Sequence, residues 1–134
     1  MLKFTLSLIS ILATITMINC SSVPCGGRGN VVDNTPLPTE WENLNTIPSG
    51  GTLCKPEELQ MAKYERIVEY ADLTPHDTIK KFQKHLTVQG WKQLKYELTD
   101  PTFYILTMEQ NGHIISVKVS KKVDKGWASV NLKI

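Results

Sequence analysis

The sequence has little excess charge of either sign and is poor in histidine. Its 134 residues include 15 Lys and Arg against 13 Asp and Glu, with 3 histidines. A near-neutral balance argues against a dedicated nucleic-acid-binding protein, because such domains are usually strongly basic. The length permits one domain and little more.

The sequence also lacks the short motifs that carry known chemistry. His76, His85 and His113 are far apart, and no clustered His, Cys or acidic spacing typical of a metal site is present. Walker, dinucleotide-binding and nucleophile-elbow motifs are absent as well. We therefore expect no enzyme activity, no catalytic residue, no metal and no cofactor, and we expect each histidine to be solvated.

No predominantly apolar run is long enough to span a bilayer. Phe4 to Ile18 carries no charge and follows a basic start at Lys3, but it falls short of the roughly 20 residues that a membrane helix needs. Polar, turn-rich sequence follows it. This pattern is typical of a signal peptide, which we assign to residues 1–19.

The end of this segment resembles the lipobox of bacterial lipoproteins. The residues that carry the resemblance are Met17, Ile18, Asn19 and Cys20. Met17 and Asn19 depart from the usual Leu and small residue, and spirochaete lipoboxes are similarly relaxed. The resemblance implies cleavage before Cys20, lipidation of Cys20 and anchoring in the cell envelope. Ser21 is not the aspartate that holds many lipoproteins at the inner membrane, so the resemblance favours the outer membrane.

The cysteine count fits this interpretation. Three cysteines are an odd number for an exported protein, and a lipid on Cys20 accounts for one of them. Cys25 and Cys54 are then free to form a disulfide in an oxidising compartment. The alternative is two free cysteines, one in a loop and one packed in the domain.

Residues 20–50 have the composition of a tether. Proline and glycine are frequent between Ser21 and Gly51, so we expect little regular structure there. A Cys25–Cys54 disulfide would turn most of this segment into a loop pinned to the domain. Trp41 is then the residue expected to pack against the domain, which we assign to residues 51–134.

One helix is predicted with clear ends. Thr74 suits an N-cap, Pro75 the first helical position and Asp77 the capping-box acid. Gly90 suits a left-handed C-terminus. The apolar stripe of this helix consists of Ile79, Phe82 and Leu86.

Strands are expected on both sides of the helix. Residues 63–72 alternate between apolar and polar side chains, and Thr52 to Cys54 suggests a short strand before them. Four further strands are expected between residue 94 and the end of the chain, the middle two joined at Asn111-Gly112. A two-residue turn there predicts the cross-strand pairs Gln110–His113, Met108–Ile115, Leu106–Val117 and Tyr104–Val119. The predicted fold class is α+β, an antiparallel sheet with a four-stranded C-terminal meander, one or two earlier strands and one amphipathic helix on its apolar face.

Two surfaces are candidates for binding. The first would attract anionic lipids or glycans and consists of Lys80, Lys81, Lys84, Lys121, Lys122 and Lys125. Its alternative is an ordinary solvated helix face and a charged turn. The second is the outer sheet face, where strand parity puts Ile105, Ile114 and Trp127 among polar residues. Its alternative is that Cys54, the early strand or the tether covers this face.

The sequence therefore predicts a lipid-anchored envelope protein whose domain binds a partner. The partner is expected to be an envelope protein, a glycan or a host molecule, and not a nucleic acid. The competing hypothesis is a structural or inhibitory lipoprotein without a ligand-binding pocket.

Overall fold

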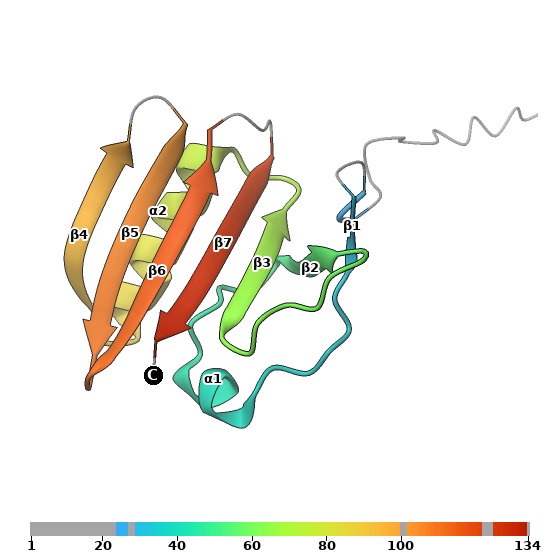
Figure 1. Cartoon of the computed structure of the whole chain (residues 1–134). Helices are drawn as coiled ribbons and strands as arrows, with labels where there is room; N and C mark the ends of the chain where they lie inside the picture. The colour runs from blue at the N-terminus through green and yellow to red at the C-terminus, as the bar shows by residue number, and fades with distance from the viewer. Residues whose placement is uncertain (1–23, 27–28, 100–101, 122–124, 134) are drawn as a thin grey trace, which may run out of the picture.

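A computed structural model describes residues 24–26, 29–99, 102–121 and 125–133 of the chain. Within these residues, seven strands form an open antiparallel sheet in the order β1-β2-β3-β7-β6-β5-β4 (Figure 1). The strands are β1 (Asn30–Val32), β2 (Thr52–Pro56), β3 (Glu65–Tyr70), β4 (Lys92–Thr99), β5 (Phe103–Gln110), β6 (His113–Ser120) and β7 (Gly126–Lys133). The helices described are α1 (Thr39–Leu44) and α2 (Pro75–Val88). The predicted α+β class is confirmed.

The four C-terminal strands form the expected meander, and β7 joins it to the earlier strands. Each of β4, β5 and β6 pairs with the next strand along the chain, and β7 also pairs with β3 on its other side. The short strand predicted at Thr52–Cys54 is β2, which extends to Pro56. The C-terminal strand therefore lies inside the sheet rather than at its edge.

The central hairpin has the predicted register. Met108 lies opposite Ile115, and Leu106 lies opposite Val117, both on the apolar face. Asn111 and Gly112 have φ values of 50° and 81°, as a type I′ turn requires at its two central residues. The turn thus fixes which side chains of β5 and β6 reach the core.

Helix α2 has both predicted caps. The Thr74 hydroxyl accepts a hydrogen bond from the Asp77 amide at 3.1 Å, and Pro75 is the first helical residue. At the other end Gly90 has a φ of 92°, and its amide donates to the Thr87 carbonyl. The following amide, that of Trp91, donates to the carbonyl five residues back, which completes a Schellman motif.

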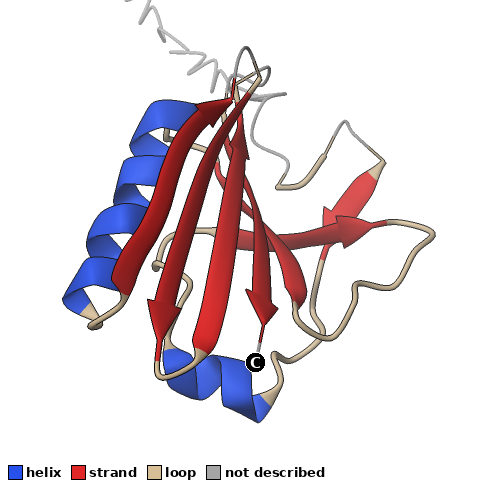
Figure 2. Cartoon of the chain, turned by 60° about the vertical axis from the view of Figure 1, so that its left-hand side comes forward, coloured by secondary structure: helices blue, strands red, loops and turns tan. Residues whose placement is uncertain are grey.

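The core lies between α2 and one face of the sheet, called here the inner face (Figure 2). Ile79, Phe82 and Leu86 are fully buried, and the Phe82 ring meets the Tyr70 ring edge-on at 5.8 Å. A Cβ added at Gly126 would overlap the side chain of α2 that lies against it, so this glycine allows helix and sheet to approach closely. The buried sheet residues beneath α2 are Leu106, Met108, Ile115, Val117, Val119, Ala128, Val130 and Leu132.

The segment before Gly51 contains more regular structure than the sequence predicts. It forms β1, which pairs with β2, and the short helix α1. Trp41 of α1 is 1% exposed, and its indole N–H donates to the Thr46 hydroxyl at 2.7 Å. The expectation of an irregular tether is wrong for this part, because strand pairing and one buried aromatic side chain outweigh its proline and glycine content. The expectation that Trp41 packs on the domain is confirmed.

Strand β4 departs from the predicted alternation at its start. Tyr96 and Leu98 lie opposite core-facing residues of β5, but the register shifts between Gln93 and Lys95. The alternation expected from Leu94 onward therefore holds only after this irregularity. Because β4 is the last strand of the sheet, Leu94 and Leu98 remain 49% and 58% exposed.

Candidate functional site

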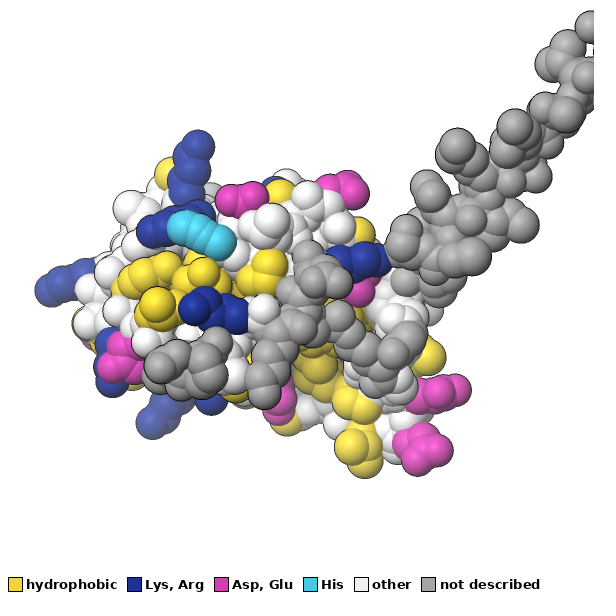
Figure 3. Space-filling model, turned by 90° about the horizontal axis from the view of Figure 1, so that it is seen from above, with side chains coloured by type: hydrophobic (Ala, Val, Ile, Leu, Met, Phe, Trp, Pro, Cys, Tyr) yellow, Lys and Arg dark blue, Asp and Glu magenta, His cyan; other side chains and the backbone are white. Residues whose placement is uncertain are grey.

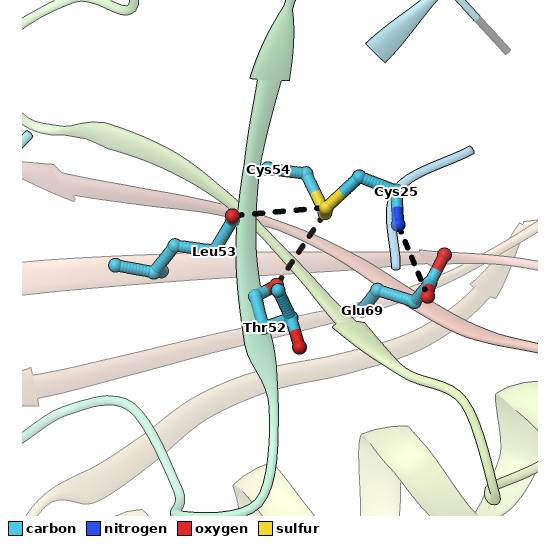
Figure 4. Close-up of a disulfide and its surroundings, with 5 residues drawn as sticks. All are labelled: Cys25, Thr52, Leu53, Cys54 and Glu69. Atoms are coloured by element: carbon cyan, nitrogen blue, oxygen red, sulfur yellow. Dashed lines mark hydrogen bonds between the residues drawn. A yellow bond between two sulfur atoms is a disulfide. The ribbon is translucent and has the colours of Figure 1, made fainter. Parts of the chain in front are cut away.

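A disulfide joins Cys25 to Cys54 on the sheet face opposite α2, called here the outer face (Figure 4). Their Cα atoms are 5.7 Å apart, and both residues are fully buried. The Cys25 amide donates to a carboxylate oxygen of Glu69 at 3.4 Å. The predicted pairing is confirmed, and it fastens the start of the described chain to the β2–β3 part of the sheet.

Cys20, the predicted lipidation site, lies outside the described residues. It precedes Cys25 by five residues, which span at most about 18 Å when fully extended. Any anchor on Cys20 would therefore hold the disulfide end of the sheet close to the membrane.

Among the described residues, the Cys25 turn covers one end of the outer face. Glu69 lies directly opposite Trp127 and is 7% exposed, because the Cys25 turn packs over it. Towards β5 and β6, no helix among the described residues lies on this face, which is turned to the viewer in Figure 1. Trp127 and Ile105 are both half-buried on it. The outer face is therefore covered beside the disulfide and open towards β5 and β6. Each of the two expectations, a covered face and an open binding surface, holds for one part of it.

Hydrogen-bonding side chains form a row across the open part of the outer face. Successive register pairs bring Glu65, Asn131, Ser116 and Thr107 side by side on β3, β7, β6 and β5. The next row contains two aliphatic residues, Ile67 and Ile105, with Ser129 and Lys118 between them. The face thus has a fully polar row beside a row that mixes aliphatic and polar side chains.

A shallow groove of about 560 Å³ lies at the lower end of the outer face. Ile114 supplies an apolar wall, while Ser116, Asn131 and Glu65 supply a hydroxyl, an amide and a carboxylate. Lys63 and Lys133 stand at its rim. These groups can hydrogen-bond to a polar backbone or a sugar while an apolar group contacts the isoleucine. Sequence reasoning did not identify the groove, because β3 supplies part of it and its place beside β7 has no local signal.

The predicted basic surface divides into separate parts. Lys80 and Lys121 lie over the rings of two neighbouring tyrosines, Tyr96 and Tyr104, at 4.9 and 5.1 Å. Lys81 instead lies 5.4 Å from the Tyr70 ring, on the β3 side of α2. The remaining members are Lys84, which is exposed, Lys125, which is half-buried, and Lys122, which lies outside the described residues.

The upper end of the molecule therefore combines basic and apolar side chains, which Figure 3 shows as blue and cyan groups around a yellow area. The His76 ring lies 5.9 Å from that of Tyr104. Burial, with a smaller contribution from Tyr104, raises the pKa of Tyr96. The contacts of Lys80 and Lys121 hold the lysine stems against the two tyrosine rings.

Arg66 forms a second polar cluster that sequence reasoning missed. Its guanidinium donates to the carbonyls of Ala62 and Glu65 at 2.8 and 2.6 Å and lies 5.3 Å from the Trp41 ring. Its Nε is 3.9 Å from a carboxylate oxygen of the buried Asp33. Both residues border a cavity of about 190 Å³. Arg66 and Asp33 are 33 positions apart, so no local sequence pattern predicts their pairing. The contacts of Arg66 link α1, the end of β1 and β3.

No grouping of metal ligands occurs in the described part of the chain. There, no three His, Cys, Asp or Glu side chains come together as metal ligands would. His85 has its Nε2 2.7 Å from the Asn45 carbonyl oxygen, and the Nδ1 of His113 is buried. No helix of residues 24–26, 29–99, 102–121 and 125–133 is long and apolar enough to cross a membrane.

Comparison with known proteins found no relative. No protein-family model matches the chain, and no curated protein or solved structure is significantly similar to it. The function must therefore be inferred from the residues and their arrangement.

Proposed function

We propose that this chain is a lipid-anchored protein of the bacterial cell envelope whose domain binds a partner through its outer sheet face. Residues 1–19 direct export, and Cys20 receives the lipid. The partner is an envelope protein, a glycan or a host molecule that hydrogen-bonds to the polar row and contacts the neighbouring aliphatic side chains.

The disulfide supports the anchor. It occupies Cys25 and Cys54, so Cys20 is the one cysteine of three that is left for lipidation. A disulfide also fits an exported protein, since cytosolic thiols are kept reduced. A diacylated cysteine gives stable membrane attachment, at roughly 0.8 kcal/mol for each buried CH₂ group.

The observation that carries the binding proposal is the asymmetry of the sheet. Within the described residues, α2 and the segment around Trp41 cover the inner face, whereas β5, β6 and β7 present their outer side chains without a helix over them. A partly apolar sheet face with a groove is a surface that a protein or glycan can contact. The disulfide lies on the same face, and neither of its cysteines lines the groove.

A pull-down from detergent-solubilised envelope tests this proposal. Ser116→Arg places a long charged side chain in the groove, and we expect it to abolish capture of the partner that the wild type retains. Thr87→Arg introduces the same side chain at an exposed position on α2 and is the matched control, which we expect to capture normally.

Two results would contradict the proposal. Equal capture by wild type and Ser116→Arg would remove the groove from the interface. A wild-type chain that captures nothing would favour the alternative of a structural or inhibitory lipoprotein.

A further inference from the structure

Strand β4 is a long free edge of the sheet. It has eight residues, and within the described chain it pairs with β5 on one side only. Its unpaired backbone groups can bond to another strand. Cys25 is bonded to Cys54 of β2, and β2 lies toward the opposite end of the sheet from β4 (Figure 1).

The exposed side chains of β4 include two leucines. Leu94 and Leu98 are 49% and 58% exposed, and Leu98 points to the same side of the sheet as α2. Two of the contacts from α2 to β4 are made by polar residues of the helix. These are Gln83, which donates to Gln93 at 2.6 Å, and Lys80, which lies over Tyr96. The edge thus has both a free backbone and exposed apolar side chains.

The sequence of this edge is complementary to itself. Consider two identical β4 strands paired antiparallel, with Tyr96 of one copy opposite Tyr96 of the other. Lys95 of each copy then faces Glu97 of the other copy. On the other face, Tyr96 comes opposite Tyr96 of the second copy, and Leu98 points to the same side. Opposite charges and apolar pairs across strands both stabilise a sheet.

The neighbouring registers are unfavourable. Residues directly opposite each other in paired strands lie on the same face of the sheet. For two identical antiparallel strands related by a twofold axis, the axis must therefore pass beside a residue, and alternative registers shift the axis by whole residues. Centring on Lys95 places two lysines directly opposite each other, and centring on Glu97 places two glutamates opposite each other. Like charges in directly opposed positions destabilise a sheet. The charge pattern therefore selects the register centred on Tyr96.

The centre of this register, from Lys95 to Glu97, lies in a regular part of β4. From Lys95 to Thr99 the strand pairs regularly with β5, and the irregularity lies before Lys95. In the single chain Lys95 and Glu97 form an exposed ion pair at 2.9 Å, with side chains 58% and 41% exposed. Both charges are therefore available to a second strand without disturbing the core.

We propose that β4 pairs with β4 of a second copy of this chain, antiparallel and centred on Tyr96, to form a dimer with one continuous sheet. The pairing is independent of the outer-face groove, because it uses the edge of the sheet. It joins the two domains at the edges farthest from their disulfides.

Charge reversal tests the pairing on the full chain purified in detergent. In either single variant, Lys95→Glu or Glu97→Lys, residues 95 and 97 carry the same charge and face each other at two places in the dimer. We therefore expect each variant to lose the dimer boundary in sedimentation velocity. The double variant Lys95→Glu with Glu97→Lys restores opposite pairs and should restore the dimer. Circular dichroism should be unchanged throughout, since both side chains are exposed.

A zero-length carbodiimide cross-link gives a second measurement. When unlabelled and ¹⁵N-labelled chains are mixed, we expect linked peptides containing Lys95 of one isotope and Glu97 of the other. A monomeric wild type, a dimer insensitive to the single reversals, or links confined to one isotope would each overturn the proposal.

Discussion

Tyr70 joins three parts of the molecule through one side chain. Its hydroxyl donates to the Pro48 carbonyl at 2.6 Å, and its ring contacts Phe82 of α2. The residue is 2% exposed, and this burial raises its pKa well above the usual value of about 10. The hydroxyl therefore stays protonated in the folded state at pH values where the unfolded chain loses its proton.

We expect Tyr70→Phe to have a pH-dependent effect on stability. Near pH 7 it removes a buried hydrogen bond and should lower the free energy of unfolding by about 1–2 kcal/mol. Above pH 10 the unfolded wild type ionises at Tyr70, so wild-type stability falls as pH rises, and the variant lacks this loss. The difference between the two proteins should thus narrow from pH 7 to pH 11.

Urea unfolding at a series of pH values measures this difference. Both proteins should carry Cys20→Ala, so that no free thiol at that position attacks the disulfide at alkaline pH. Stability curves that run parallel from pH 7 to pH 11 would show that Tyr70 titrates alike in the folded and unfolded chains.

At the scale of single elements, helix α2 depends on its N-cap. The Thr74 hydroxyl accepts the Asp77 amide, which otherwise has no partner within the helix. Thr74→Ala should therefore lower the free energy of unfolding by about 1 kcal/mol. Thr87→Ala is the matched control, because its hydroxyl donates only to the carbonyl one turn back, at an exposed position. Equal losses for the two variants in chemical denaturation would contradict the capping role.

Local chemistry explains which elements the sequence predicts. The Asn111-Gly112 turn and the caps of α2 depend on residues within a few positions of each other, so hairpin register and helix ends follow from the sequence. Helix α1 and strand β1 are stabilised instead by distant partners. Trp41 is held by Arg66, and the β1 backbone is paired with β2. Such contacts leave no periodic pattern in a segment rich in proline and glycine.

The candidate site likewise combines features that follow from the local sequence with features that depend on distant residues. Parity along the strands predicts that Ile105 and Trp127 lie on the outer face, and the register bears this out. The polar row and its groove also require Glu65 of β3 to lie beside β7. That pairing joins residues 65 and 131 and has no local signal, so the groove emerges only from the assembled sheet.

At the scale of the whole molecule, the disulfide closes a loop that spans 29 positions and contains β1 and α1. Replacing both cysteines by serine should lower the free energy of unfolding by roughly 3–4 kcal/mol, because the unfolded chain regains the freedom of this loop. Reduction of the wild type should cause a similar loss. Cys20→Ser is the control and should leave stability unchanged. A double variant as stable as the wild type would show that packing around Trp41 alone holds the segment.

The membrane anchor relates this fold to its proposed role. With Cys25 fastened to the sheet, a lipid on Cys20 would leave a link of only five residues between membrane and domain. The outer face and its groove would then operate within a short distance of the bilayer. The proposed role of the protein therefore depends on the chemistry of Cys20.

Metabolic labelling with radioactive palmitate in a bacterial host tests that chemistry directly. We expect the wild-type chain to incorporate the label and Cys20→Ala to incorporate none, with the Cys25–Cys54 disulfide intact in both. A wild-type chain that stays unlabelled, or a Cys20→Ala variant labelled as strongly as the wild type, would contradict the account.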